Sequence, residues 1–110
     1  MRAGAENFRE ALINDEDDIY IASRSLKAMA HPLRLKILCI LGGCTEVSVQ
    51  DIVERVGTSQ SNISQHLSIL RDKGILAFRK DANKVYYRIE DNRIVKLIDS
   101  LREAFCSRQR

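Results

Sequence analysis

The stretch TSQSNISQHLSILRDKG, residues 58–74, decides how the whole chain is interpreted. Seven of its first eight residues are Ser, Thr, Gln or Asn, and such side chains favour caps and turns because they compete with the backbone for hydrogen bonds. Ile63, Leu67 and Leu70 nevertheless recur at helical spacing. Ser59 is placed to cap the start of a helix, and the final glycine suits the position after its last turn. The stretch therefore predicts a helix with one buried stripe and a very polar opposite face.

The polar face of this predicted helix points to DNA. Serine and glutamine side chains can hydrogen-bond to base edges and phosphates, and a helix N-terminus favours a phosphate. A helix that is only solvated more often carries Glu and Lys, although a merely polar surface helix is the alternative. His66 lies between the two faces, where it either touches a phosphate or packs as a hydrogen-bonded histidine. The DNA-binding residues that we predict on this helix are Ser59, Gln60, Ser61, Ser64, Gln65, His66, Ser68 and Arg71.

A second helix directly precedes this one in the sequence. SVQDIVERVG, residues 48–57, begins with Ser48 as its predicted N-cap and ends at Gly57, with four apolar residues at helical spacing between them. Two helices joined by a short turn that contains glycine are the pattern of a helix-turn-helix.

A hairpin follows the polar helix. ILAFRK, residues 75–80, and KVYYRI, residues 84–89, are rich in strand-forming residues and are joined by the turn sequence DAN. Arg79, Lys80 and Lys84 cluster around this turn. We expect these three residues to bind DNA, either in the minor groove or along the backbone.

Further helices are predicted at both ends of the chain. Residues 15–30 begin with acidic side chains, and the next helix starts at Pro32 and ends at Gly42, because proline suits a first turn and glycine an end. The predicted order is α-α-α-α-β-β-α, a mainly α (α+β) fold of the winged helix-turn-helix class. The last helix, residues 91–106, carries an apolar face formed by Ile94, Leu97, Ile98, Leu101 and Phe105.

Composition and charge fit a single small domain that binds a polyanion. The 110 residues are 45% hydrophobic, without an apolar run long enough to span a membrane or a secretory signal at the start, so we expect a cytoplasmic protein. The net charge is only +3, but residues 1–20 hold six acidic and two basic side chains, whereas residues 71–88 hold six basic and two acidic ones. The basic segment favours a polyanion partner, with an ordinary solvated surface as the alternative.

Three motifs resemble one known family. LKAMAHPLRLKIL (residues 26–38), SQSNISQHLSILRDKGIL (residues 59–76) and KVYYRI are similar to the ArsR-type winged-helix repressors, over roughly residues 20–106. The resemblance implies a homodimer, formed through the first and last helices, that binds an imperfect inverted repeat with its recognition helices in successive major grooves. We divide the chain into an N-terminal arm or helix extension (1–14), a DNA-binding and dimerisation domain (15–106) and a tail (107–110).

The metal sites of this family are not matched by the sequence. Where the thiolate metal sensors carry Cys-x-Cys, this chain has Ser48 and Gln50, which do not bind soft metals. Other members bind zinc or nickel through His and carboxylates on the last helix, but this last helix offers Asp99 and Glu103 without a histidine. We therefore predict neither of these metal sites and no cofactor.

The positions of two cysteines resemble those of a thiol-based sensor rather than a metal site. Cys39 and Cys106 are placed like the cysteine pair of the SqrR, BigR and HlyU-like subgroup, which senses persulfides or oxidants. The resemblance implies that the two thiols face each other within a protomer, become joined by a disulfide or polysulfide, and thereby release DNA. The inducer would then be a persulfide, a polysulfide or an oxidant.

Several alternatives remain open at the level of the sequence. Cys39 lies in an apolar stripe, where a cysteine is usually a small core residue. Cys44 follows two glycines and is a bystander, a competing partner for Cys39, or a third ligand with Cys39 and Cys106 for As(III). The protein would then be a metalloid sensor, or, with structural cysteines, a constitutive DNA-binding protein. A thiol enzyme is not expected, because the chain has no C-x-x-C and no glycine-rich phosphate loop.

Overall fold

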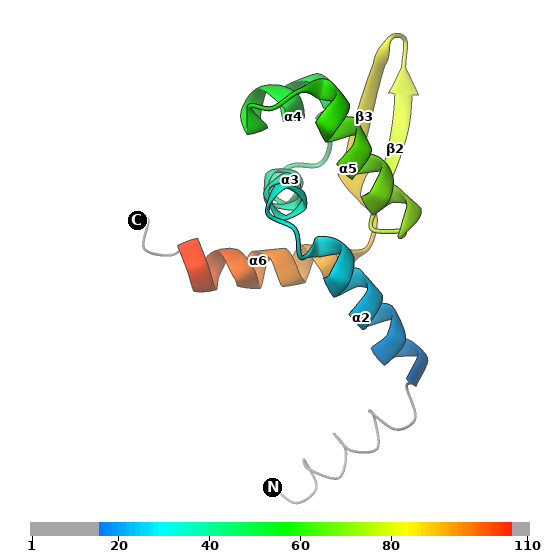
Figure 1. Cartoon of the computed structure of the whole chain (residues 1–110), viewed down its shortest axis with the longest axis vertical. Helices are drawn as coiled ribbons and strands as arrows, with labels where there is room; N and C mark the ends of the chain where they lie inside the picture. The colour runs from blue at the N-terminus through cyan, green and yellow to red at the C-terminus, as the bar shows by residue number, and fades with distance from the viewer. Residues whose placement is uncertain (1–15, 107–110) are drawn as a thin grey trace, which may run out of the picture.

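The computed structural model describes residues 16–106, with side chains up to residue 105 (Figure 1). The predicted arm (1–14) and tail (107–110) lie outside the described residues. The order of helices and hairpin is confirmed, with one short strand added before the helix-turn-helix. The elements are α2 (Glu16–Met29), α3 (Pro32–Gly42), β1 (Val47–Ser48), α4 (Val49–Val56), α5 (Gln60–Asp72), β2 (Leu76–Asp81), β3 (Lys84–Ile89) and α6 (Asn92–Cys106).

The two helices of the helix-turn-helix begin and end where the sequence predicts. The Ser48 hydroxyl accepts a hydrogen bond from the backbone N–H of Asp51 at 3.1 Å, and Ser59 does the same for Asn62 at 3.1 Å. Gly57 has φ +82°, in the left-handed region that glycine enters without steric cost, and so it ends α4. These caps fix the short turn that orients α5 relative to α4.

The start of α3 has a cap that the sequence did not reveal. Pro32 occupies the first turn, as predicted, and the side chain of His31 is the N-cap: its Nδ1 accepts the backbone N–H of Leu33 at 3.1 Å.

The sheet has three antiparallel strands in the order β1-β3-β2. Val47 pairs with Tyr87 on β3, so the segment between α3 and α4 is joined to the wing. Asp81 pairs with Lys84, which places Asp81 in β2 rather than in the predicted turn and leaves a two-residue turn at its tip. Two residues are too few to show the alternation by which a strand is predicted, and β1 was missed for that reason.

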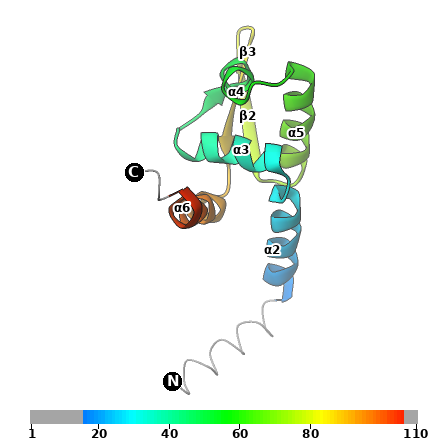
Figure 2. The ribbon, with the colours of Figure 1, turned by 60° about the vertical axis from the view of Figure 1, so that its left-hand side comes forward.

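A central helix separates the two ends of the molecule. Figure 2 shows α3 crossing the middle, with α4, α5 and the hairpin on one side and α2 and α6 on the other. No helix within residues 16–106 is both long and apolar enough to cross a membrane. The most completely buried large side chains among the described residues are Ile37, Leu38, Leu41, Ile52, Ile63, Leu67, Leu70, Ile75 and Ile98.

The packing of α3 against α6 depends on a missing side chain. A Cβ atom on Gly42 would lie 3.1 Å from Cγ2 of Ile98, which is fully buried and has little room to move. A Cβ atom on the neighbouring Gly43 would instead meet only ordinary contacts, the nearest at 3.5 Å from Nη2 of Arg102.

We expect Gly42→Ala to lower the free energy of unfolding relative to Gly43→Ala. Overpacking costs about 1–3 kcal/mol, and the better helix propensity of alanine, worth about 1 kcal/mol, offsets only part of it. Urea denaturation of both variants measures the difference. Equal midpoints for the two variants would contradict a tight α3–α6 contact.

Candidate functional site

The polar face of α5 is exposed as the sequence predicts. Ile63, Leu67 and Leu70 are at most 1% exposed, and they fix the rotation of the helix about its axis. The opposite side consists of hydroxyl and amide groups without a formal charge. Its exposed residues are Ser59, Gln60, Ser61, Ser64 and Gln65, followed by half-buried Ser68.

A groove separates α5 from the wing. Gln60 and Ser64 of α5 line one wall, and Asn83 and Lys84 at the tip of the hairpin line the other. Gln50 in the first turn of α4 also lines the groove. Sequence reasoning missed Asn83 and Gln50 as candidate DNA contacts, because it took the first as a turn residue and the second as a replaced metal ligand. Their shared groove is visible only once the hairpin is folded against α4 and α5.

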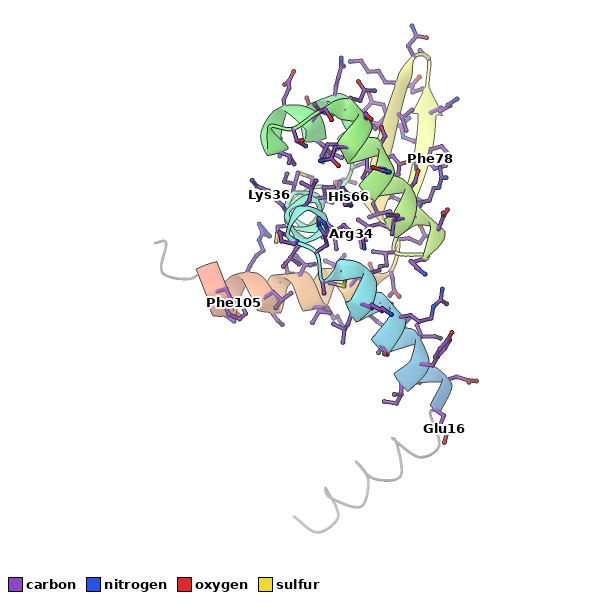
Figure 3. All side chains as sticks on the ribbon, viewed as in Figure 1. Glu16, Arg34, Lys36, His66, Phe78 and Phe105 are labelled. Carbon is purple, nitrogen blue, oxygen red and sulfur yellow. The ribbon has the colours of Figure 1, made fainter. Side chains whose placement is uncertain are left out.

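Arg71 joins the recognition helix to the wing. Its guanidinium carbon lies 5.1 Å from the ring centre of Phe78 on β2, and Phe78 stacks on Tyr87 with ring centres 5.7 Å apart. In Figure 3 Phe78 lies at the hairpin, beside α5. This cation–π contact holds the wing beside α5, and Nη2 of Arg71 also lies 3.8 Å from Oδ1 of the exposed Asp72. Contact of Arg71 with a phosphate stays a prediction.

The guanidinium of Arg79 is held by other side chains of the protein. Its Nη2 lies 2.6 Å from Oε2 of Glu46, its Nε lies 3.0 Å from Oε1, and its guanidinium stacks 4.5 Å above the ring centre of Tyr86. The hydrogen bonds from Arg79 hold the pKa of Glu46 below its ordinary value. This bidentate pair ties β2 to the segment before β1. A role of Arg79 in DNA binding stays a prediction.

Lys80 and Lys84 supply the free charge of the wing. Both side chains are exposed, and neither forms an ion pair with a residue whose side chain the structure describes. The basic tip of the wing is therefore formed by these two lysines.

His66 has the packed, hydrogen-bonded arrangement that the sequence left open. Nε of Arg34 donates to its Nδ1 at 3.1 Å, and Nη1 of Arg34 donates to the carbonyl of Ala28 at 3.0 Å, so that α2, α3 and α5 meet here (Figure 3). The ring also lies 4.6 Å from that of His31. Burial lowers the pKa of His66, and the nearby His31 and Arg34 lower it further. Contact with a phosphate stays a prediction for this residue.

The cysteines lie around the end of α3. Cys39 is half-buried on α3, Cys44 is exposed in the loop that follows, and both line one open groove. Cys106 is the last residue of α6, and its side chain lies outside those that the structure describes. Among the described residues no group of three His, Cys, Asp or Glu side chains is placed to hold a metal ion. The predicted pairing of Cys39 with Cys106 and the three-thiol alternative both depend on a side chain that is not described.

Comparison with known proteins gives one consistent family. The family model described as bacterial regulatory protein, arsR family, matches residues 31–77. HlyU from Vibrio cholerae superposes with a TM-score of 0.79 at 38% identity, covering 83% of this chain and 98% of that one. The transcriptional repressor BigR from Xylella fastidiosa gives a TM-score of 0.77 at 30% identity, covering 89% and 96%. The homodimeric winged helix-turn-helix DNA-binding domain Mb0332 from Mycobacterium bovis gives 0.72 at 26% identity, covering 81% and 82%.

The exposed polar helix, the basic wing and these relatives agree with one another. The chain belongs to the arsR family of bacterial regulatory proteins and is a DNA-binding transcription regulator with a winged helix-turn-helix fold.

Proposed function

We propose that this protein is a homodimeric repressor whose operator binding is lost when Cys39 and Cys106 become joined through sulfur. The observation that supports DNA binding best is the groove between the uncharged polar face of α5 and the tip of the wing. In this proposal Ser61, Ser64 and Gln65 reach base edges in a major groove. Lys80 and Lys84 bind the phosphate backbone, because free cations near a polyanion release its counterions.

The exposed apolar side chains at the other end of the molecule support a dimer. Ile19, Tyr20, Ile21 and Leu26 on α2 are 43–63% exposed, and Phe105 on α6 is 76% exposed. An apolar groove between the two helices adds Leu97. Large exposed apolar side chains are typical of interaction surfaces, and the relative Mb0332 is a homodimer with a winged helix-turn-helix fold. A second copy of this chain covers these groups in our proposal.

The contact between α3 and α6 supports the thiol switch. The helix that carries Cys39 packs tightly on the helix that ends at Cys106, through Gly42 and Ile98. A thiolate that attacks an electrophilic sulfur is resolved by a second thiol in reach. In our proposal Cys106 at the end of α6 is that second thiol for Cys39 on α3. Since α6 belongs to the proposed dimer interface, a bridge to α3 alters the spacing of the two recognition helices.

A second candidate is metalloid sensing by Cys39, Cys44 and Cys106. The shared groove of Cys39 and Cys44 favours it, because it brings two thiols to one surface. Thiolates are the ligands that thiophilic ions prefer. The two candidates differ in the role of Cys44, which the bridge does not need and the three-thiol site does.

Truncating the polar face of α5 is expected to weaken operator binding. Gln65→Ala and Ser64→Ala should each cost about 1–3 kcal/mol for the operator and little for random DNA if these side chains read bases. Ser100→Ala, at an exposed serine on α6, is the matched control. Fluorescence anisotropy at fixed salt measures all three, and unchanged affinity in both α5 variants would mean that the reading face is elsewhere.

Removing a wing charge is expected to act on all sequences alike. Lys84→Gln should weaken binding to operator and random DNA by similar factors and reduce the slope of log K against log salt by about 0.9, the value for one lost phosphate contact. Lys96→Gln, at an exposed lysine on α6, should leave the slope unchanged. A loss confined to the operator would show that Lys84 reads a base instead.

The switch itself is tested with the reduced full-length protein on its operator. Glutathione persulfide, hydrogen peroxide and arsenite are added in turn, and intact mass is recorded beside anisotropy. We expect persulfide to abolish binding and to join Cys39 to Cys106, with Cys39→Ser and Cys106→Ser insensitive and Cys44→Ser still responsive. Release by arsenite alone, with dependence on Cys44, would favour the metalloid sensor. Binding that survives all three reagents would contradict both candidates.

A further inference from the structure

A groove at the end of α3 places positive charge beside two thiols. Its described lining residues include no carboxylate. Three of its side chains are cationic and two are thiols, and they come from α3, α4, α6 and the loop after α3. The lining residues are Lys36, Cys39, Ile40, Gly43, Cys44, Arg55 and Arg102.

The three cations of this groove are weakly compensated. Lys36 and Arg55 are exposed and form no ion pair with residues 16–105. The contact of Arg102 with Asp99 is long, at 4.0 Å between Nη1 and Oδ1. These charges contrast with Arg79 of the wing, whose guanidinium is held by a carboxylate at 2.6 Å. The groove therefore keeps a net positive charge that an anion from solution can neutralise.

One of these cations lies directly over the loop that carries the exposed thiol. The guanidinium of Arg102 is close enough to Gly43 that a Cβ atom there would lie 3.5 Å from Nη2. Cys44 is the next residue, and its backbone N–H is fixed by a hydrogen bond to the carbonyl of Leu41 at 3.1 Å. Lys36 lies on the side of α3 away from α6 in Figure 3. An anion in the groove is thus bounded by cations on more than one element.

We propose that this groove captures small anionic sulfur electrophiles, namely disulfides or polysulfides whose ends carry carboxylates, and presents their sulfur–sulfur bond to Cys44. This inference deepens the proposed thiol switch by naming the class of molecule that reaches its cysteines. Lys and Arg side chains bind carboxylates through charge-assisted hydrogen bonds. The charge of the ligand, and not only its reactivity, then selects the inducer.

The covalent step at the groove balances without any further reactant. The thiolate of Cys44 attacks one sulfur of R–S–S–R, the new bond is Cys44–S–S–R, and R–S⁻ leaves and takes a proton from water. This first exchange keeps one disulfide bond, and the two-electron reduction of R–S–S–R is complete only when a second thiol expels the other R–S⁻. Cys39, which lines the same groove, can then attack the sulfur of Cys44 and expel the second R–S⁻. The thiolate of Cys106 can then attack the sulfur of Cys39 and expel Cys44, which leaves the proposed Cys39–Cys106 bridge and returns Cys44 to its thiolate. Cys44 thus speeds the capture of the inducer without remaining in the product, so Cys44→Ser still switches but more slowly.

The test uses three disulfides of nearly equal size and different charge on the reduced full-length protein. They are 3,3′-dithiodipropionate, a dianion, bis(2-hydroxyethyl) disulfide, which is neutral, and cystamine, a dication. The rate of adduct formation at Cys44 is followed by intact mass and peptide mapping. Because the leaving thiols differ in intrinsic reactivity, each rate is expressed relative to the same probe on the variants Lys36→Gln and Arg102→Gln.

The expected result is a selective effect on the anionic probe. Each lost cation should slow dithiodipropionate about five-fold, the effect of unit charges about 4 Å apart in water, and it should speed cystamine. The neutral probe should not change, and salt should shrink the anionic effect. Lys96→Gln, outside the groove, should act on none of the probes. Lys36 is exposed, so its variant should fold even if Arg102→Gln does not.

Equal effects of the variants on all three probes would overturn the inference, as would adducts that avoid Cys44. This readout contains no DNA. Anion selectivity without operator release would therefore leave the groove in place and remove the proposed switch. Operator release without anion selectivity would instead support the proposed switch and overturn the role of the groove.

Discussion

The burial of one stripe on α5 is the constraint on which the site depends. Ile63, Leu67 and Leu70 pack into the core at almost zero exposure, and this burial sets the rotation of α5. A turn of the helix by one residue would move hydroxyl and amide groups into the core, where unpaired polar groups are costly. The caps at Ser59 and Lys73 then set where α5, and with it the polar face, begins and ends. The position of every candidate base contact on α5 follows from these apolar residues rather than from the polar ones.

Elements with strong local signals could be predicted from the sequence. The helices of the helix-turn-helix were predicted with their caps because Ser48, Ser59 and Gly57 act on neighbours a few residues away. The hairpin was predicted from two strand-forming runs and a short turn. The buried and exposed faces of α5 followed from helical spacing alone. Local propensity and periodicity carry this information, because the interactions that cap a helix or turn a hairpin join residues a few positions apart.

Features that join distant segments could not be predicted in the same way. Glu46 and Arg79 are 33 residues apart, and nothing in either neighbourhood indicates that they form a bidentate pair. The same holds for Arg34 and His66, which are 32 residues apart. The groove that brings Lys36 and Arg102 to the cysteines exists only after α6 has packed on α3. Sequence reasoning found the wing cations by type, but it did not show which of them the protein uses internally.

The absence of formal charge from the exposed face of α5 between Ser59 and Ser68 has a consequence for how the protein finds its operator. Binding to random DNA rests on cation–phosphate attraction, and this attraction permits sliding along the duplex. In the proposed binding mode this attraction comes from Lys80 and Lys84 of the wing rather than from the exposed face of α5. That face would then slow the search for the operator only where its side chains can form hydrogen bonds to bases.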